Sequence, residues 1–162
     1  MRQLLILLSL VATATFAADE KAKPVVKQSA DEKIALKAID ATVHGKETRF
    51  GSELGHDFIG WWSSKDDHVS WELDIDKPGE FSVEIIYSCP PDCAGSAYDV
   101  TVGANAKLSA KVANSGGWQS YKTETIGKLK LAKGKQKLVV QPTSKPGYAV
   151  MDLAEIRLSP VK

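Results

Sequence analysis

The chain has 162 residues, of which 43% are hydrophobic and 25% are charged, and its formal net charge at pH 7 is +1. This length is sufficient for one domain with a buried hydrophobic core. The near-zero charge argues against a function that depends on overall attraction to nucleic acid or to anionic lipid.

Residues 1–18 have the features of an export signal. Arg2 supplies a positive charge, residues 4–11 are apolar but too few to span a bilayer, and residues 15–18 offer small side chains to a signal peptidase. We therefore expect an exported protein, periplasmic or extracellular, without a membrane span.

The next segment, residues 19–33, is charged and has few large apolar side chains, which predicts a flexible leader. Residues 34–39 fit two structures. The capping-box spacing of Ser29 and Glu32 favours a helix, whereas alternation of apolar side chains along IALKAI favours a strand. Local propensity does not separate the two.

The clearest pattern lies in residues 67–88, DHVSWELDIDKPGEFSVEIIYS. Apolar side chains occupy every second position in 69–75 and again in 81–87, a period of two that indicates β-strands. Lys77, Pro78 and Gly79 between them have the composition of a tight turn. We therefore predict a hairpin of two antiparallel strands, with one face covered and the other in water.

Cys89 and Cys93 lie four positions apart in the segment that follows. In an exported chain, two cysteines at this spacing favour a disulfide bond within one loop. The spacing differs from the C-x-x-C of redox enzymes, and without a nearby His the two thiolates would make a poor zinc site.

Further alternating runs cover much of the remaining chain, and Gly or Asn stands at nearly every junction. About nine strands with turn signals roughly every ten residues predict an all-β protein, a two-sheet sandwich or jelly roll. We expect one such module over residues 34–162.

Several segments together resemble a known group of modules: IGWW, DDHVSWELDIDKPGEFSVEIIYSC, AYDVTVG, SGGWQSY, IGKLKLAKGKQKLVVQP and GYAVMDLAEIRLSP. They are similar to galactose-binding-like β-jelly-roll modules, in particular carbohydrate-binding module family 6 and the C-terminal accessory module of bacterial α-L-fucosidases and sulfatases. The likeness covers residues 34–160. It implies a strand at residues 34–39, a two-sheet antiparallel jelly roll, and a secreted, non-catalytic domain that binds a glycan.

Family 6 modules usually hold a structural calcium with acidic residues of the first strand and an Asp of the last strand. The matching positions here are Lys37, Ile39 and Asp152. A cationic and an apolar side chain cannot supply the oxygen ligands that calcium needs. We therefore expect no metal and no other cofactor. The Asn that the family often carries before its last strand is also missing, and Tyr148 stands near its place.

The resemblance implies a glycan site built from loop aromatics. Trp118 follows two glycines, which would let the indole stand clear and stack on a sugar ring; the alternative is a core Trp that caps the sandwich. Trp61 and Trp62 would point to opposite faces of an extended backbone, and we expect Trp62 to face outward. The other ligand-binding residues are expected to be Tyr148, Gln119 and Asp67.

Catalysis receives no support from the polar clusters. We interpret Asp66 and Asp67 as turn residues before a strand and His68 as exposed on the polar face of that strand, and the chain has no H-E-x-x-H or G-x-S-x-G motif. A glycosidase needs only two carboxylates, but the small size of the chain argues against one. The expectation is a protein that is not an enzyme.

Five lysines crowd residues 128–137. We expect these lysines mainly to protect an exposed strand edge from pairing with other strands. The alternative is a patch that binds sulfated or uronic glycans.

The whole chain also has an alternative function. It could be a structural or adaptor domain of the cell envelope or of a glycan-degrading system, which would bind protein partners.

Overall fold

The computed structural model describes residues 22–162, which form twelve β-strands and one short 3₁₀ helix. The export signal predicted for residues 1–18 lies outside the described residues. The strands are β1 (Val25–Lys27), β2 (Ile34–Lys37), β3 (Thr42–His44), β4 (Arg49–Glu53), β5 (His56–Gly60), β6 (His68–Ile75), β7 (Gly79–Ser88), β8 (Ala97–Val102), β9 (Ala106–Lys111), β10 (Lys122–Leu131), β11 (Gly134–Ser144) and β12 (Asp152–Pro160), and the helix is η1 (Ala38–Asp40).

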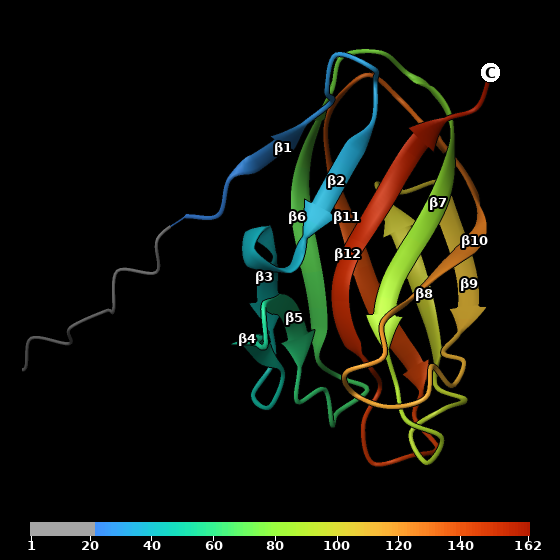
Figure 1. Ribbon diagram of the computed structural model, residues 1–162. Helices are drawn as coiled ribbons and strands as arrows, with labels where there is room; N and C mark the ends of the chain where they lie inside the picture. The colour runs from blue at the N-terminus through green and yellow to red at the C-terminus, as the bar shows by residue number, and fades with distance from the viewer. Residues whose placement is uncertain (1–21) are drawn as a thin grey trace, which may run out of the picture.

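The strands form two six-stranded sheets that face each other (Figure 1). One sheet has the order β1-β6-β11-β8-β9, with β3 also paired to β6, and the other has the order β10-β7-β12-β5-β4, with β2 also paired to β12. This confirms the predicted two-sheet jelly-roll sandwich. There are more strands than the nine expected because β1, β3 and β4 are short and do not show the alternation of a half-buried strand.

The predicted hairpin of residues 67–88 is wrong. Strands β6 and β7 have the expected positions, but β6 pairs with β11 and β7 pairs with β10 and β12. The connection at residues 76–78 thus carries the chain from one sheet to the other. Alternation fixes which side chains point inward but does not fix the neighbouring strand, so it fits this connection as well as a hairpin.

The core lies between the two sheets, and β6 and β7 contribute four inward side chains each. Val69, Trp71, Leu73 and Ile75 of β6 are at most 1% exposed, and so are the four inward side chains of β7, which are Phe81, Val83, Ile85 and Tyr87. Removing such side chains from water is the main favourable contribution to folding. The two strands recognised most clearly in the sequence therefore supply the centre of the sandwich.

The flexible leader predicted for residues 19–33 needs correction. Within it, β1 pairs in parallel with residues 72–74 of β6. The Gln28 side chain then accepts hydrogen bonds of 2.8 Å from the amides of both Asp76 and Lys77. The module therefore begins before residue 34. The strand expected at 34–39 is confirmed for β2, after which the chain turns into η1.

Strand register distinguishes the two ends of the sandwich. At one end Leu131 pairs with Gly79, and at the other Asp152 pairs with Ser88. Four connections leave the second end, which we call the loop end: residues 61–67, 89–96, 112–121 and 145–151. They lie at the bottom of Figure 1. Within residues 22–162, no helix has the length and apolar character needed to cross a membrane.

Candidate functional site

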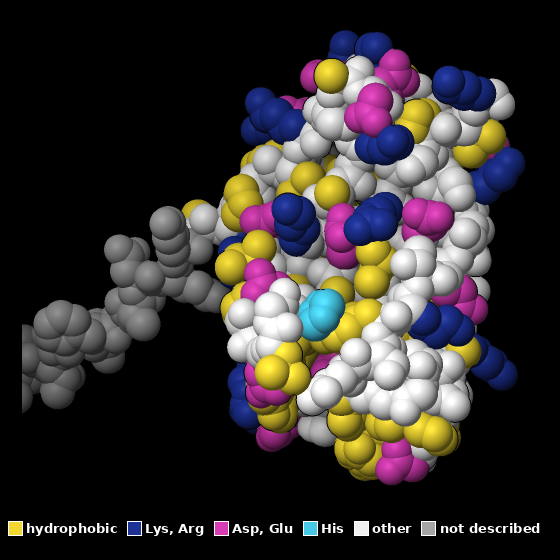
Figure 2. Space-filling view, in the orientation of Figure 1, with side chains coloured by type: hydrophobic (Ala, Val, Ile, Leu, Met, Phe, Trp, Pro, Cys, Tyr) yellow, Lys and Arg dark blue, Asp and Glu magenta, His cyan; other side chains and the backbone are white. Residues whose placement is uncertain are grey.

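A pocket of about 480 Å³ opens at the loop end. It lies between the β4–β5 hairpin and the loops at 61–67, 112–121 and 145–151. Figure 2 shows hydrophobic side chains gathered at the lower end of the molecule, with charged residues interspersed over the face above. The side chains that shape the pocket are Arg49, Phe58, Trp61, Trp118, Tyr148 and Asp152.

The expectation that Trp62 faces outward is wrong, because its side chain is fully buried and Trp61 is 42% exposed instead. The reason is local: Trp61 has a φ of 50°, so the backbone is not extended and simple alternation does not apply. The Trp62 indole donates a hydrogen bond of 3.1 Å to the carbonyl of Asp67, and the Trp62 carbonyl accepts one of 2.8 Å from the Val150 amide. Trp62 therefore fixes two of the pocket loops to each other.

Trp61 forms one wall of the pocket. Its ring stacks on Phe58 with centroids 5.6 Å apart, and the Arg49 guanidinium lies 4.1 Å from its centroid. Gly51 and Gly60 make room for these rings, since a β-carbon on Gly51 would lie 2.7 Å from Trp61 and one on Gly60 would lie 2.7 Å from Phe58. This cation–π and ring packing holds a partly exposed indole in one orientation.

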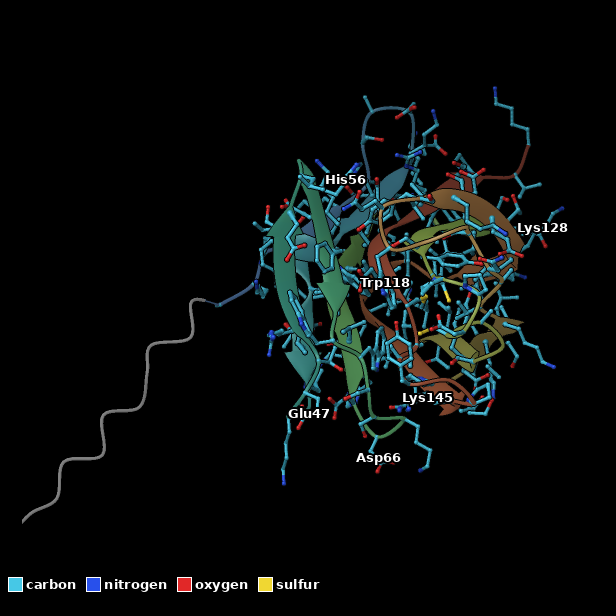
Figure 3. The ribbon with its side chains drawn as sticks, turned by 60° about the horizontal axis from the view of Figure 1, so that its bottom comes forward. Glu47, His56, Asp66, Trp118, Lys128 and Lys145 are labelled. Carbon is cyan, nitrogen blue, oxygen red and sulfur yellow. The ribbon has the colours of Figure 1, made fainter. Side chains whose placement is uncertain are left out.

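Trp118 and Tyr148 form the opposite wall. The Trp118 indole donates a hydrogen bond of 3.3 Å to the Tyr148 hydroxyl, and the rings meet edge to face with centroids 6.3 Å apart. Trp118 is half-buried against the core and also lines the pocket, and its role as a sugar platform stays a prediction. Tyr148 is 57% exposed. In the view of the loop end, Trp118 lies near the centre, with His56 and Lys145 on opposite sides (Figure 3).

Asp67 was expected to bind sugar hydroxyls, but it is only 6% exposed and does not line the pocket. Its carboxylate accepts hydrogen bonds from the amides of Glu47, at 3.1 Å, and Thr48, at 3.0 Å. Burial acts to raise the pKa of Asp67, but these hydrogen bonds outweigh burial and hold the pKa below its usual value. Asp67 therefore shapes the loop that leads into β4.

Gln119 is exposed and lies beside a second pocket of about 440 Å³. That pocket shares Glu53, Phe58, Trp118 and Asp152 with the first. The four shared side chains, two of them from the β4–β5 hairpin, place the two pockets next to each other.

Asp152 matches a calcium ligand of family 6 modules in the sequence, and the structure places it in the pocket. It begins β12 and its carboxyl group lines both pockets, without a hydrogen bond or ion pair to any other described side chain. Burial disfavours the charged form, and the negative charge of Glu53 adds to this effect, so the pKa of Asp152 rises to about 7. Among residues 22–162, no three His, Cys, Asp or Glu side chains are arranged to hold a metal ion.

The predicted disulfide between Cys89 and Cys93 is not present. Both cysteines are free thiols and both are fully buried. The Cys89 thiol donates to the carbonyl of Pro90 at 3.3 Å, and burial raises its pKa to about 11. These cysteines pack as small apolar side chains beneath the loops, a role that their spacing in the sequence does not distinguish from a bridge.

Comparisons with known proteins bear on the fold. No family model matches the sequence. Over 65 residues, 40% of this chain, the sequence is 28% identical to a β-agarase of Microbulbifer thermotolerans, and the match covers 15% of that enzyme's length.

Solved structures give a more extensive match. A family 35 carbohydrate-binding module of Clostridium thermocellum has a TM-score of 0.67 and 12% identity, covering 80% of this chain and 98% of that module. A family 35 module of Cellvibrio japonicus has a TM-score of 0.66 at 13% identity and covers 80% and 94% of the two chains. The C-terminal family 6 module of a laminarinase of Zobellia galactanivorans has a TM-score of 0.63 at 14% identity, with 78% and 98% covered. The chain therefore shares the galactose-binding-like β-jelly-roll fold of carbohydrate-binding modules of families 6 and 35.

Proposed function

We propose that this protein is an exported, non-catalytic carbohydrate-binding module that holds a glycan in the pocket at the loop end. The observation that carries the proposal is the pair of aromatic walls, Trp61 on one side and Trp118 with Tyr148 on the other, around an unpartnered Asp152 carboxyl group. Sugar rings have apolar faces that stack on such side chains and hydroxyls that need polar partners.

The charges of the pocket favour an uncharged glycan. Glu47 and Glu53 outnumber the single cation Arg49, whose guanidinium is placed over the Trp61 ring, and Asp152 adds negative charge as pH rises through about 7. An acidic or sulfated glycan would meet repulsion here. The lysines that suggested such a ligand begin at Lys128 and flank the β10–β11 turn, at the end of the sandwich away from the pocket.

The fold also supports the proposal of carbohydrate binding, since solved modules with this architecture are named for carbohydrate binding. The matched relatives and neighbours include a β-agarase, a β-1,4-mannanase, a laminarinase and an exo-β-1,3-galactanase. Agarose, β-1,4-mannan, laminarin and β-1,3-galactan are therefore suitable first ligands. Export is part of the proposal and rests on residues 1–18.

Affinity electrophoresis of the chain in gels that contain each of these polysaccharides tests the proposal. We expect retarded migration in at least one gel, and loss of the retardation in Trp61→Ala. Phe50→Ala is the matched control, because Phe50 is an exposed aromatic on the neighbouring strand β4 but does not line the pocket. Equal migration of wild type and Trp61→Ala in every gel would contradict the proposal.

A further inference from the structure

The second pocket has binding features of its own. His56 stacks on Tyr121 with ring centroids 4.7 Å apart, which offers a flat surface beside the exposed amide of Gln119. Leu54 lies at the tip of the β4–β5 hairpin with a φ of 51° and is 76% exposed. A large apolar side chain held exposed in this less favourable conformation extends the apolar surface of the pocket.

Four side chains lie between the two pockets and line both of them. Phe58 and Trp118 supply aromatic surface on each side, and Glu53 and Asp152 supply carboxyl oxygens. A ligand that fills one pocket therefore reaches the edge of the next without leaving the protein surface. The shared carboxyl groups lie at the junction, where a sugar hydroxyl would find a hydrogen-bond acceptor.

We propose that the two pockets are consecutive subsites of one groove, which binds a chain of uncharged sugar units rather than a single terminal sugar. Trp61, Arg49 and Tyr148 belong to the first subsite, and His56, Tyr121 and Gln119 belong to the second. This inference rests on the proposed glycan-binding function. It adds that affinity depends on ligand length and that the two subsites contribute separately.

Isothermal titration of the full chain with two-unit and six-unit oligosaccharides of agarose, β-1,4-mannan, laminarin and β-1,3-galactan tests the inference. The six-unit ligand should bind about tenfold more tightly, because it adds contacts in the second subsite. Gln119→Ala and His56→Ala should each weaken the six-unit ligand by about fivefold, as expected for one lost net hydrogen bond or ring contact. The same variants should leave the two-unit ligand unchanged, whereas Trp61→Ala should weaken both.

Two kinds of failure are distinguishable. If Trp61→Ala abolishes binding but Gln119→Ala and His56→Ala bind the six-unit ligand like wild type, the second subsite is wrong and the proposed function stands. If wild type binds none of these ligands, or Trp61→Ala changes nothing, both are wrong. Thermal melting of each variant verifies that a loss of affinity does not result from unfolding.

Discussion

The indole of Trp118 donates a hydrogen bond to the hydroxyl of Tyr148, 30 residues away in the sequence. Each residue comes from a different loop, and the two loops are fixed by separate contacts. The Trp118 carbonyl accepts a bond of 2.8 Å from the Ser88 hydroxyl, and the Lys145 ammonium group donates one of 2.8 Å to the carbonyl of Gly147. The pocket wall formed by these two loops is thus fixed by one contact to the end of β7 and by one contact within the loop at 145–151, and a wall that is already ordered lowers the cost of binding a ligand.

Replacing the adjacent residues Trp61 and Trp62 by alanine should have opposite effects on stability and on glycan binding. Trp62→Ala should destabilise the protein by about 3–5 kcal/mol, the usual cost of emptying a buried aromatic site, since Trp62 is fully buried. Trp61→Ala should change stability far less and should abolish most glycan binding. Urea unfolding of both variants measures the first effect, and a similar loss of stability in the two would contradict the assignment.

Asp67 should stabilise the fold without touching the ligand. Asp67→Asn should cost about 1–3 kcal/mol at neutral pH, because three backbone amides lose a charged acceptor. Folding lowers the pKa of Asp67, so its contribution is present above the unfolded pKa of about 4 and is lost as pH falls through the folded value. Unfolding curves at neutral and acid pH should therefore converge for wild type and variant at the acid end.

Asp152 should titrate near neutral pH, with a pKa of about 7. Folding raises this pKa. The contribution of Asp152 to the stability of the fold is therefore fully present below the unfolded pKa of about 4, and it is lost as pH rises through about 7. Asp152→Asn should therefore gain stability relative to wild type over this range. Carbon-13 NMR of the carboxyl group measures the pKa directly. In Glu53→Gln the pKa should fall only in part, because burial is the larger cause.

Both cysteines should remain as thiols. Mass spectrometry after alkylation in denaturant, without reductant, should find two modified cysteines per chain, as the two buried free thiols require. The melting temperature should be the same with and without a reducing agent. A chain that takes up the alkylating agent only after reduction would contradict the structure at Cys89 and Cys93.

The sequence predicts the layers of this fold better than its connections. Period-two alternation in β6 and β7 reports which side chains enter the core, and both strands are buried as expected. It carries no information on the strand that lies alongside, which depends on long-range packing. The short strand β1 was missed because its pairing with β6 depends on backbone hydrogen bonds that no side-chain pattern records.

The candidate site was predicted in part. Trp118, Gln119 and Tyr148 were identified from their loops and lie at the two pockets. Trp61 was missed because one positive φ reverses the alternation on which the choice of Trp62 depended. Asp152 was missed as a pocket-lining group because its raised pKa arises from burial and from Glu53, a residue 99 positions earlier, and only the folded chain brings the two together.

The central claim is that a glycan binds against Trp61 and Trp118, and the chain's four tryptophans provide an internal test. Each indole N–H gives a separate nitrogen–proton NMR signal, and Trp62 and Trp71 are buried with their N–H groups bonded to backbone carbonyls. During titration with a six-unit oligosaccharide of the polysaccharide that retards the chain most, the Trp61 and Trp118 signals should shift while those of Trp62 and Trp71 stay in place. If the Trp61 and Trp118 signals remain fixed at saturating ligand, the glycan does not bind in this pocket.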